Sequence, residues 1–137
     1  MKKRFILTFP PDAVQEPVTY NLIKNFDIRV NILNAYISFE EGGRLAVEFE
    51  GAEAAMRAGL DYVRKLAIDC VPLEKNITFQ QEQCINCGAC TAVCFAGALQ
   101  MDKISWKLTF DAERCIVCEL CTGACPLKLF HIDFVEQ

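Results

Sequence analysis

The sequence has no long apolar stretch, only one histidine, and no cysteine before residue 70. Its longest apolar runs, such as residues 33–39, are too short and too interrupted to cross a bilayer, so we expect no membrane span. Residues 1–4 include three basic side chains, but the apolar segment 5–9 is too short for a signal peptide and runs into two prolines. We therefore expect the chain to be cytoplasmic.

Positive charge is also scarce. The chain holds 14 Lys and Arg against 18 Asp and Glu, and residues 77–137 hold four basic residues against seven acidic ones. A basic patch for nucleic acid is therefore not expected, whereas a protein partner with a basic docking face suits this charge. The sequence also has no acid–base pair, activated nucleophile or substrate-pocket pattern, so we do not expect the chain to catalyse a reaction alone.

Cysteine is abundant in one half of the chain only. Eight of the nine cysteines lie between Cys84 and Cys125, and the composition changes near Lys75 and Asn76. We infer two domains, residues 1–76 and residues 77–137. Because nothing directs the chain to an oxidising compartment, metal ligation is favoured over disulfides.

The C-terminal half is an internal duplication. A shift of 31 residues superposes residues 77–99 on residues 108–130 and aligns every cysteine. Each copy predicts a short strand (77–79 and 108–110), a cysteine-bearing loop, and one helical turn that begins near the fourth cysteine. Such short elements cannot build a core alone, so we expect folding to be coupled to metal binding.

The cysteine spacing is C-x2-C-x2-C-x3-C in both copies, and Pro126 follows the second one. This pattern resembles the bacterial ferredoxins that hold two [4Fe–4S] clusters, in which the fourth cysteine of each run binds the other cluster. The resemblance implies that cluster I is bound by Cys84, Cys87, Cys90 and Cys125, and cluster II by Cys115, Cys118, Cys121 and Cys94. Two structural zinc sites are the alternative, although these usually present two separated cysteine pairs. Clusters that serve only as structural staples are a further alternative.

Several neighbouring residues suit such loops. We expect Ile85 and Ile116 to screen the clusters from water, and Gly88 to occupy a position of positive φ. Glu119 stands at the position equivalent to Gly88, and its charge should disfavour the reduced state of cluster II. The two potentials should therefore differ.

The remaining features of this half carry simpler predictions. Phe95 stands where proline usually follows the fourth cysteine, so we expect a local rearrangement of that loop. Residues 100–107 should form a hairpin between the copies, with Trp106 covering one cluster. His131 is not expected to be a ligand, because the eight cysteines suffice.

The N-terminal half predicts an α+β domain of order βαββαβ, the split-βαβ arrangement of a four-stranded antiparallel sheet with two helices on one face. Val18, Leu22 and Phe26 mark one face of a helix that begins near residue 16 or 17. A change of alternation near Ile32 predicts a bulge in the second strand. The predicted elements are a strand at 5–9, a helix from 16 or 17, a strand at 28–39, a turn at Gly42 and Gly43, a strand at 45–49, a helix at 52–66 that buries Ala55, Gly59, Tyr62 and Leu66, and a strand at 68–73.

The second strand contains Asn31, Ile32 and Leu33, the triplet of the NIL domain family, and the flanking elements also resemble that family. NIL domains occur on methionine-import ATPases and fused to two-cluster ferredoxins. The whole chain is similar to such fusions, which are associated in anaerobes with homocysteine formation from aspartate semialdehyde. The resemblance implies an iron–sulfur subunit that works with a sulfurtransferase subunit.

The leading functional prediction is therefore an electron carrier that delivers low-potential electrons to a partner enzyme. The alternative is an NIL module that binds methionine or a related amino acid and regulates a general ferredoxin. Asn31 is either a residue of the sheet or a contact for a ligand or partner, and a homodimer is plausible for a sheet of this type. Cys70 is expected to pack as a small apolar residue, with a reactive thiol as the alternative.

Overall fold

The structure is a computed structural model of the whole chain, and it describes residues 1–132, apart from the side chain of Asn76. The chain divides into two compact units, residues 1–73 and residues 74–137, close to the predicted boundary after residue 76. Among the described residues, every helix is too short or too polar to span a bilayer.

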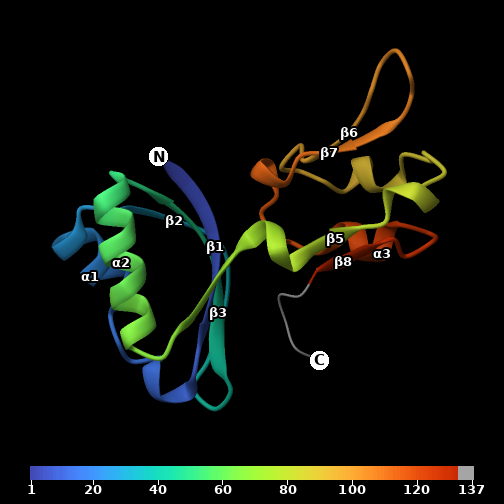
Figure 1. Cartoon of the computed structure of the whole chain (residues 1–137). Coiled ribbons are helices and arrows are strands. Elements are labelled where there is room, and N and C mark those ends of the chain that lie inside the picture. Colours follow the sequence, from blue (N-terminus) through green and yellow to red (C-terminus); the bar gives the residue numbers. More distant parts are fainter. Residues whose placement is uncertain (133–137) are drawn as a thin grey trace. The chain divides into compact units, whose positions relative to one another are not determined.

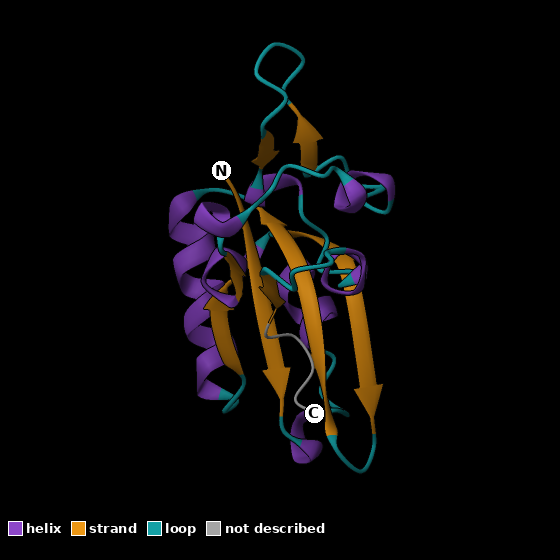
Figure 2. Cartoon of the chain, turned by 90° about the vertical axis from the view of Figure 1, so that its right-hand side faces the viewer, coloured by secondary structure: helices purple, strands orange, loops and turns teal. Residues whose placement is uncertain are grey.

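The N-terminal unit follows the predicted order of strands and helices. Its elements are β1 (Lys2–Phe9), the 3-10 helix η1 (Pro11–Ala13), α1 (Val18–Phe26), β2 (Arg29–Ser38), β3 (Gly42–Glu50), α2 (Glu53–Lys65) and β4 (Asp69–Pro72). The strands form one antiparallel sheet of order β2-β3-β1-β4. Both helices lie on the same side of this sheet (Figure 1). Figure 2 shows the strands of the sheet in orange, in a view turned by 90°.

An ordinary apolar core lies between the sheet and its helices. Val18 and Leu22 of α1 are buried, as predicted, and Phe26 packs on Tyr62 of α2 with ring centroids 5.3 Å apart. The bulge is also confirmed, since the β2–β3 register shifts between Ile32 and Asn34. The switch in alternation that predicted it marks the extra residue.

Two predictions about this unit need correction. The buried face of α2 is centred on Met56, Gly59 and Val63, while the predicted Ala55, Tyr62 and Leu66 are only partly buried. Tyr62 stays at the boundary because its hydroxyl accepts a hydrogen bond from Asn21 Nδ2 at 2.7 Å.

The turn between β2 and β3 also lies at a different position from the predicted one. It consists of residues 39–41, and Gly42 and Gly43 are already the first residues of β3. Gly42 has a φ of +85°, and a Cβ there would lie 2.2 Å from the carbonyl oxygen of Phe9. Glycine is therefore required by the positive φ at the first residue of β3 and by its close approach to the backbone of β1.

The C-terminal unit is built from short elements. After η2 (Leu73–Asn76) these are β5 (Ile77–Phe79), η3 (Gln81–Gln83), η4 (Ala89–Ala92), β6 (Leu99–Met101), β7 (Leu108–Phe110), η5 (Ala112–Arg114), α3 (Leu120–Ala124) and β8 (Phe130–Ile132). Two small antiparallel sheets, β5–β8 and β6–β7, hold them together. The predicted strands are confirmed, but the helical turns η4 and α3 begin just before the third cysteine of each copy, not near the fourth.

We predict that Gly42→Ala destabilises the N-terminal unit by about 2 kcal/mol, because alanine adds both left-handed strain and a clash with the backbone of β1. Hydrogen exchange of the β1 and β3 amides in the intact protein measures the change. Gly51→Ala is the matched control, since its Cβ would meet nothing nearer than 3.5 Å, and it should change stability by less than about 0.5 kcal/mol. Equal effects of the two substitutions would refute the prediction.

Candidate functional site

One group of cysteines lines a single pocket of the C-terminal unit. Cys84, Cys87 and Cys90 come from the first copy, and Cys125 comes from the second copy at the end of α3. The pocket is partly open to solvent, and apolar side chains from both copies complete its wall: Phe79, Ile85, Leu108, Pro126, Leu127, Leu129 and Phe130. The structure thus brings together the four cysteines that the ferredoxin resemblance assigns to cluster I.

The thiols also influence one another electrostatically in two groups. Burial raises the pKa of the Cys90 thiol, and the charges of Cys125, Cys84 and Cys87 act in the same direction. Burial, and then the charges of Cys115, Cys118 and Cys94, raises the pKa of the Cys121 thiol to about 12. Each group therefore combines three cysteines of one copy with one of the other.

The loops that carry these groups share an unusual backbone. Three positions in each copy have a positive φ, and each lies 31 residues from its counterpart: Asn86 and Val117, Gly88 and Glu119, Gly97 and Lys128. The predicted positive φ of Gly88 is confirmed at 76°. Six left-handed positions within two short loops show that the path of the chain around the sulfurs is tightly determined.

The first of these positions aims an amide at a sulfur. The backbone N–H of Asn86 donates to Cys84 Sγ at 3.4 Å, and that of Val117 donates to Cys115 Sγ at the same distance. Val117 is β-branched and fully buried, so its left-handed conformation (φ 58°) costs about 1–3 kcal/mol. The second copy thus carries local strain in order to keep the same amide–sulfur hydrogen bond.

The second left-handed position starts a helical turn. The Thr91 hydroxyl donates to the Gly88 carbonyl at 2.6 Å, and the Thr122 hydroxyl donates to the Glu119 carbonyl at 2.6 Å. These bonds hold η4 and α3 against the loops, which is why both turns begin before the third cysteine. The aligned threonines were visible in the duplicated sequence, but their role required the structure.

Sequence reasoning also missed Asn86. Its Oδ1 accepts a hydrogen bond from the backbone N–H of Leu108 at 2.9 Å and so joins the first cysteine loop to β7. The sequence did contain a signal, which is an asparagine two residues after a ligand-type cysteine. Asparagine is one of the residues other than glycine that most often adopt a positive φ.

Two predictions concern exposed aromatic residues. One hydrogen bond of the loop after Cys94 is kept despite Phe95, since Gly97 N donates to Cys94 O at 3.2 Å as Lys128 N does to Cys125 O. The hairpin between the copies is present, but Trp106 is 67% exposed and lies outside the lining of the described pocket.

The other candidate residues belong to neither cysteine group. His131 is exposed on β8. Cys70 packs against the core of the N-terminal unit, and burial raises the pKa of its thiol to about 11, although Arg64 opposes the shift. This thiol is therefore protonated at neutral pH, as suits a packing residue. Asn31 is exposed on β2 opposite Glu48.

The donor set fits a polynuclear cluster better than a zinc ion. Among the described residues, no three Cys, His, Asp or Glu side chains converge closely enough to bind one metal ion. A tetrahedral zinc site with Zn–S bonds of about 2.3 Å brings its sulfurs to roughly 3.8 Å from one another. A [4Fe–4S] cluster would be held by the four cysteines of each group, and its positive charge would offset the burial and the neighbouring cysteine charges that raise the pKa values of the Cys90 and Cys121 thiols.

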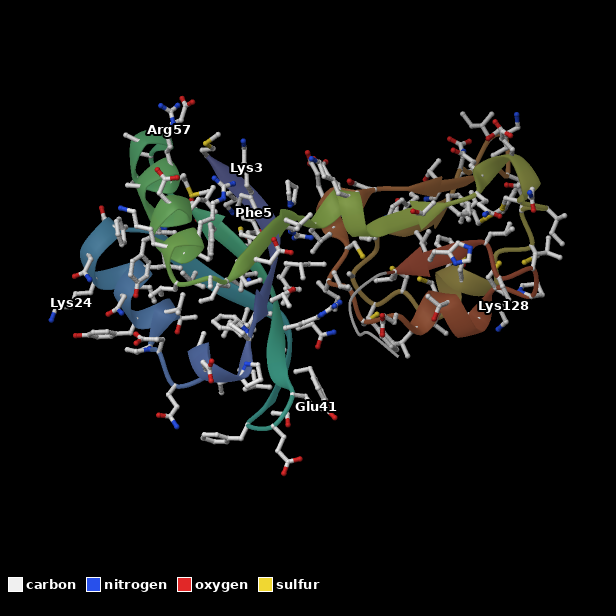
Figure 3. The ribbon with its side chains drawn as sticks, turned by 60° about the horizontal axis from the view of Figure 1, so that its bottom comes forward. Lys3, Phe5, Lys24, Glu41, Arg57 and Lys128 are labelled. Carbon is white, nitrogen blue, oxygen red and sulfur yellow. The ribbon has the colours of Figure 1, made fainter. Side chains whose placement is uncertain are left out.

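The side chains around the sulfurs also suit such a group. Figure 3 shows sulfur atoms lying among the loops and short helices of this unit, near the labelled Lys128. Lys128 Nζ donates to the Gly123 carbonyl at 3.3 Å and so ties the last left-handed loop to α3. Phe79 and Phe130 stack with centroids 4.5 Å apart, and Phe110 meets both rings edge-on.

Comparison with known families assigns most of the chain. Residues 3–70 match the NIL domain, and residues 83–129 match the 4Fe–4S dicluster domain. The second match indicates two [4Fe–4S] clusters in the C-terminal unit, in agreement with the cofactor prediction.

Two curated relatives span most of the chain. Both are named L-aspartate semialdehyde sulfurtransferase iron–sulfur subunit and are 29% identical to this chain. The protein of Methanocaldococcus jannaschii aligns over 75% of this chain and 77% of its own, and that of Methanosarcina acetivorans over 79% and 80%.

One solved structure is also similar. It is the C-terminal domain of an ABC transporter ATP-binding protein from Enterococcus faecalis, with a TM-score of 0.47 and 20% identity over 52% of this chain and 82% of that one.

We propose that the two thiol groups are the ligand sets of the two clusters. In this arrangement, called the crossing below, each cluster takes its fourth cysteine from the other copy, and paired substitutions test it. Cys94→Ser with Cys121→Ser removes two ligands from one proposed set, so about half of the iron and acid-labile sulfide should remain after anaerobic reconstitution. Cys90→Ser with Cys94→Ser, both from the first copy, removes one ligand from each set and should leave less. If the second variant retains more iron than the first, the crossing is wrong.

Glu119 provides a test of the electrostatic asymmetry between the sets. Glu119→Gly should raise the lower of the two cluster potentials by roughly 40 mV, since removing one nearby charge changes a one-electron reduction by about 1 kcal/mol. Anaerobic redox titration followed by electron paramagnetic resonance measures both potentials. Glu119→Gln keeps the side chain's length and should give the same shift. Unchanged potentials in both variants would rule out this role for the charge.

Proposed function

Because this chain joins a NIL domain to a 4Fe–4S dicluster domain, we propose that it is the electron-transfer subunit of a sulfurtransferase system whose partner subunit makes homocysteine from aspartate semialdehyde. The observation that carries the proposal is the pair of cysteine groups interleaved across the duplication. The names of the two relatives, which align over three quarters or more of the chain, support the assignment of the partner.

Three kinds of residue in the C-terminal unit would hold the clusters: cysteine ligands, backbone amides that donate to sulfur, and apolar side chains. The eight cysteines would bind them, and the amides of Asn86 and Val117 donate to sulfur and so favour the more negative, reduced state. Phe79, Phe130 and Leu129 form an apolar part of the wall around the first group. When bound, two clusters supply two one-electron stores, which suit a two-electron reduction of a sulfur-bearing intermediate to a thiol.

The N-terminal unit has a separate role in this proposal. Its core is complete without any cysteine ligand, so it can act as a rigid docking module for the partner subunit. We place the complex in the cytoplasm of an anaerobic cell, since solvent-accessible [4Fe–4S] clusters degrade in air and Cys87 and Cys118 are exposed.

The test is an anaerobic reoxidation assay. The reconstituted protein is reduced, mixed with extract of the source cells, and followed optically while aspartate semialdehyde and sulfide are added together or singly. Reoxidation should accelerate only when both compounds are present, because the proposed acceptor is the sulfur-bearing intermediate that they form on the partner.

The outcomes separate the proposed function from its alternative. A reoxidation rate that stays the same with and without both compounds would contradict the sulfurtransferase role. Reoxidation that instead changes on addition of methionine would favour an NIL module that regulates a general ferredoxin. Extract heated beforehand is the control for reoxidation by small molecules.

A further inference from the structure

The hairpin between the two copies exposes two large apolar side chains at its tip. Residues 102–107, the tip segment, join β6 to β7 and extend away from the other elements of this unit (Figure 1). Within it, Ile104 is 93% exposed and Trp106, the only tryptophan of the chain, is 67% exposed. None of the predicted cluster-binding residues lies in the tip segment, so the clusters do not account for these two side chains.

Hydrogen bonds order the tip segment. Asp102 Oδ1 accepts from the backbone N–H groups of Ile104 and Ser105, both at 2.8 Å. The backbone N–H of Trp106, which has a φ of 56°, donates to the Asp102 carbonyl at 2.9 Å. The bonds from Ser105 and Ile104 lower the pKa of Asp102, so the carboxylate stays ionised and keeps its acceptor role. The two apolar side chains are thus presented on a preformed turn, which reduces the entropy lost on binding.

The charge of the tip segment is opposite to that of its unit. Lys103 and Lys107 flank the apolar side chains, and they are two of only four basic residues in residues 77–137. The net negative charge of the chain predicts a partner with a basic docking face. Such a face would attract the C-terminal unit as a whole, but it would repel the two lysines of the tip segment. Ile104 and Trp106 fit an apolar pocket, and the two lysines fit carboxylates on its rim.

The base of the hairpin adjoins the first cysteine group. Leu108, the first residue of β7, lines the pocket of that group and donates its N–H to Asn86 Oδ1. Met101, at the end of β6, lies 3.8 Å from the position that a Cβ on Gly88 would occupy. A protein held at the tip segment is consequently close to the loop that carries Cys84, Cys87 and Cys90.

We propose that the tip segment is a docking element for a redox partner protein, whose surface offers an apolar pocket rimmed by carboxylates. The inference rests on the proposed role of the chain as an electron carrier, but not on the identity of the sulfurtransferase. A protein is favoured over an anionic membrane because two lysines contribute little membrane affinity, about 1 kcal/mol each, on a chain of net charge −4.

Reoxidation kinetics test the docking role. Ile104→Ser with Trp106→Ser should slow reoxidation by the macromolecular fraction of source-cell extract about tenfold, while reoxidation by a small chemical oxidant and both cluster potentials stay unchanged. Phe95→Ser is the matched control, because it removes an aromatic side chain that is 86% exposed elsewhere in the unit, and it should have no effect. The effect of aspartate semialdehyde and sulfide on the reoxidation rate is measured in a separate assay. If the proposed function fails there, the comparison of these variants with the parent protein still tests the docking role.

A binding measurement removes the reliance on electron transfer. In protein labelled with 5-fluorotryptophan, Trp106 gives the only fluorine resonance, which should broaden when the macromolecular fraction is added to the oxidised protein. Lys103→Glu with Lys107→Glu should abolish the broadening and the salt dependence of the reoxidation rate. Unchanged reoxidation in the Ile104 and Trp106 variant, or broadening by vesicles of anionic phospholipid and not by the protein fraction, would overturn the proposal.

Discussion

Thiolates confined to a small volume repel one another unless positive charge lies among them. In the C-terminal unit burial raises the pKa values of the Cys90 and Cys121 thiols, and the charges of the three cysteines around each of them act in the same direction. The iron of a [4Fe–4S] cluster supplies the missing charge. Most of what is particular about this unit, from its left-handed loops to its interleaved copies, follows from placing four sulfurs around such a group.

The two units therefore rely on different sources of stability. In the N-terminal unit, α1 and α2 cover one side of the sheet and bury thirteen apolar residues in one continuous cluster. In the described part of the C-terminal unit, residues 74–132, the buried cluster has only six residues, and two of them are Cys90 and Cys125. In the proposed ligand sets these two cysteines bind a cluster and also belong to the core, so we expect folding of the unit to be coupled to metal binding. The N-terminal unit can serve as a docking module because its own core owes nothing to metal.

The duplication explains both the symmetry and the asymmetry of the site. Equivalent amide–sulfur bonds and equivalent threonine bonds recur 31 residues apart. The copies differ at most positions outside the cysteines, and two of these differences fall on left-handed positions: Gly88 against Glu119 and Asn86 against Val117. Because the backbone is so closely repeated, such single substitutions can distinguish the two sets electrostatically without disturbing their geometry. The hairpin segment between the copies adds a surface that neither copy needs for its cysteines.

The sequence alone determined the strands of the N-terminal unit, the strands β5 and β7 of the C-terminal unit, the bulge near Ile32 and the cofactor, whereas β8 was not predicted. Each depends on local periodicity or on ligand spacing, which a linear pattern records directly. The tertiary structure decided which flank of α2 is buried, why Gly42 must be glycine, where the short helical turns begin, and that Trp106 faces solvent. These features depend on contacts between distant segments, such as Gly42 with Phe9 or Asn86 with Leu108, and no local pattern encodes such distances.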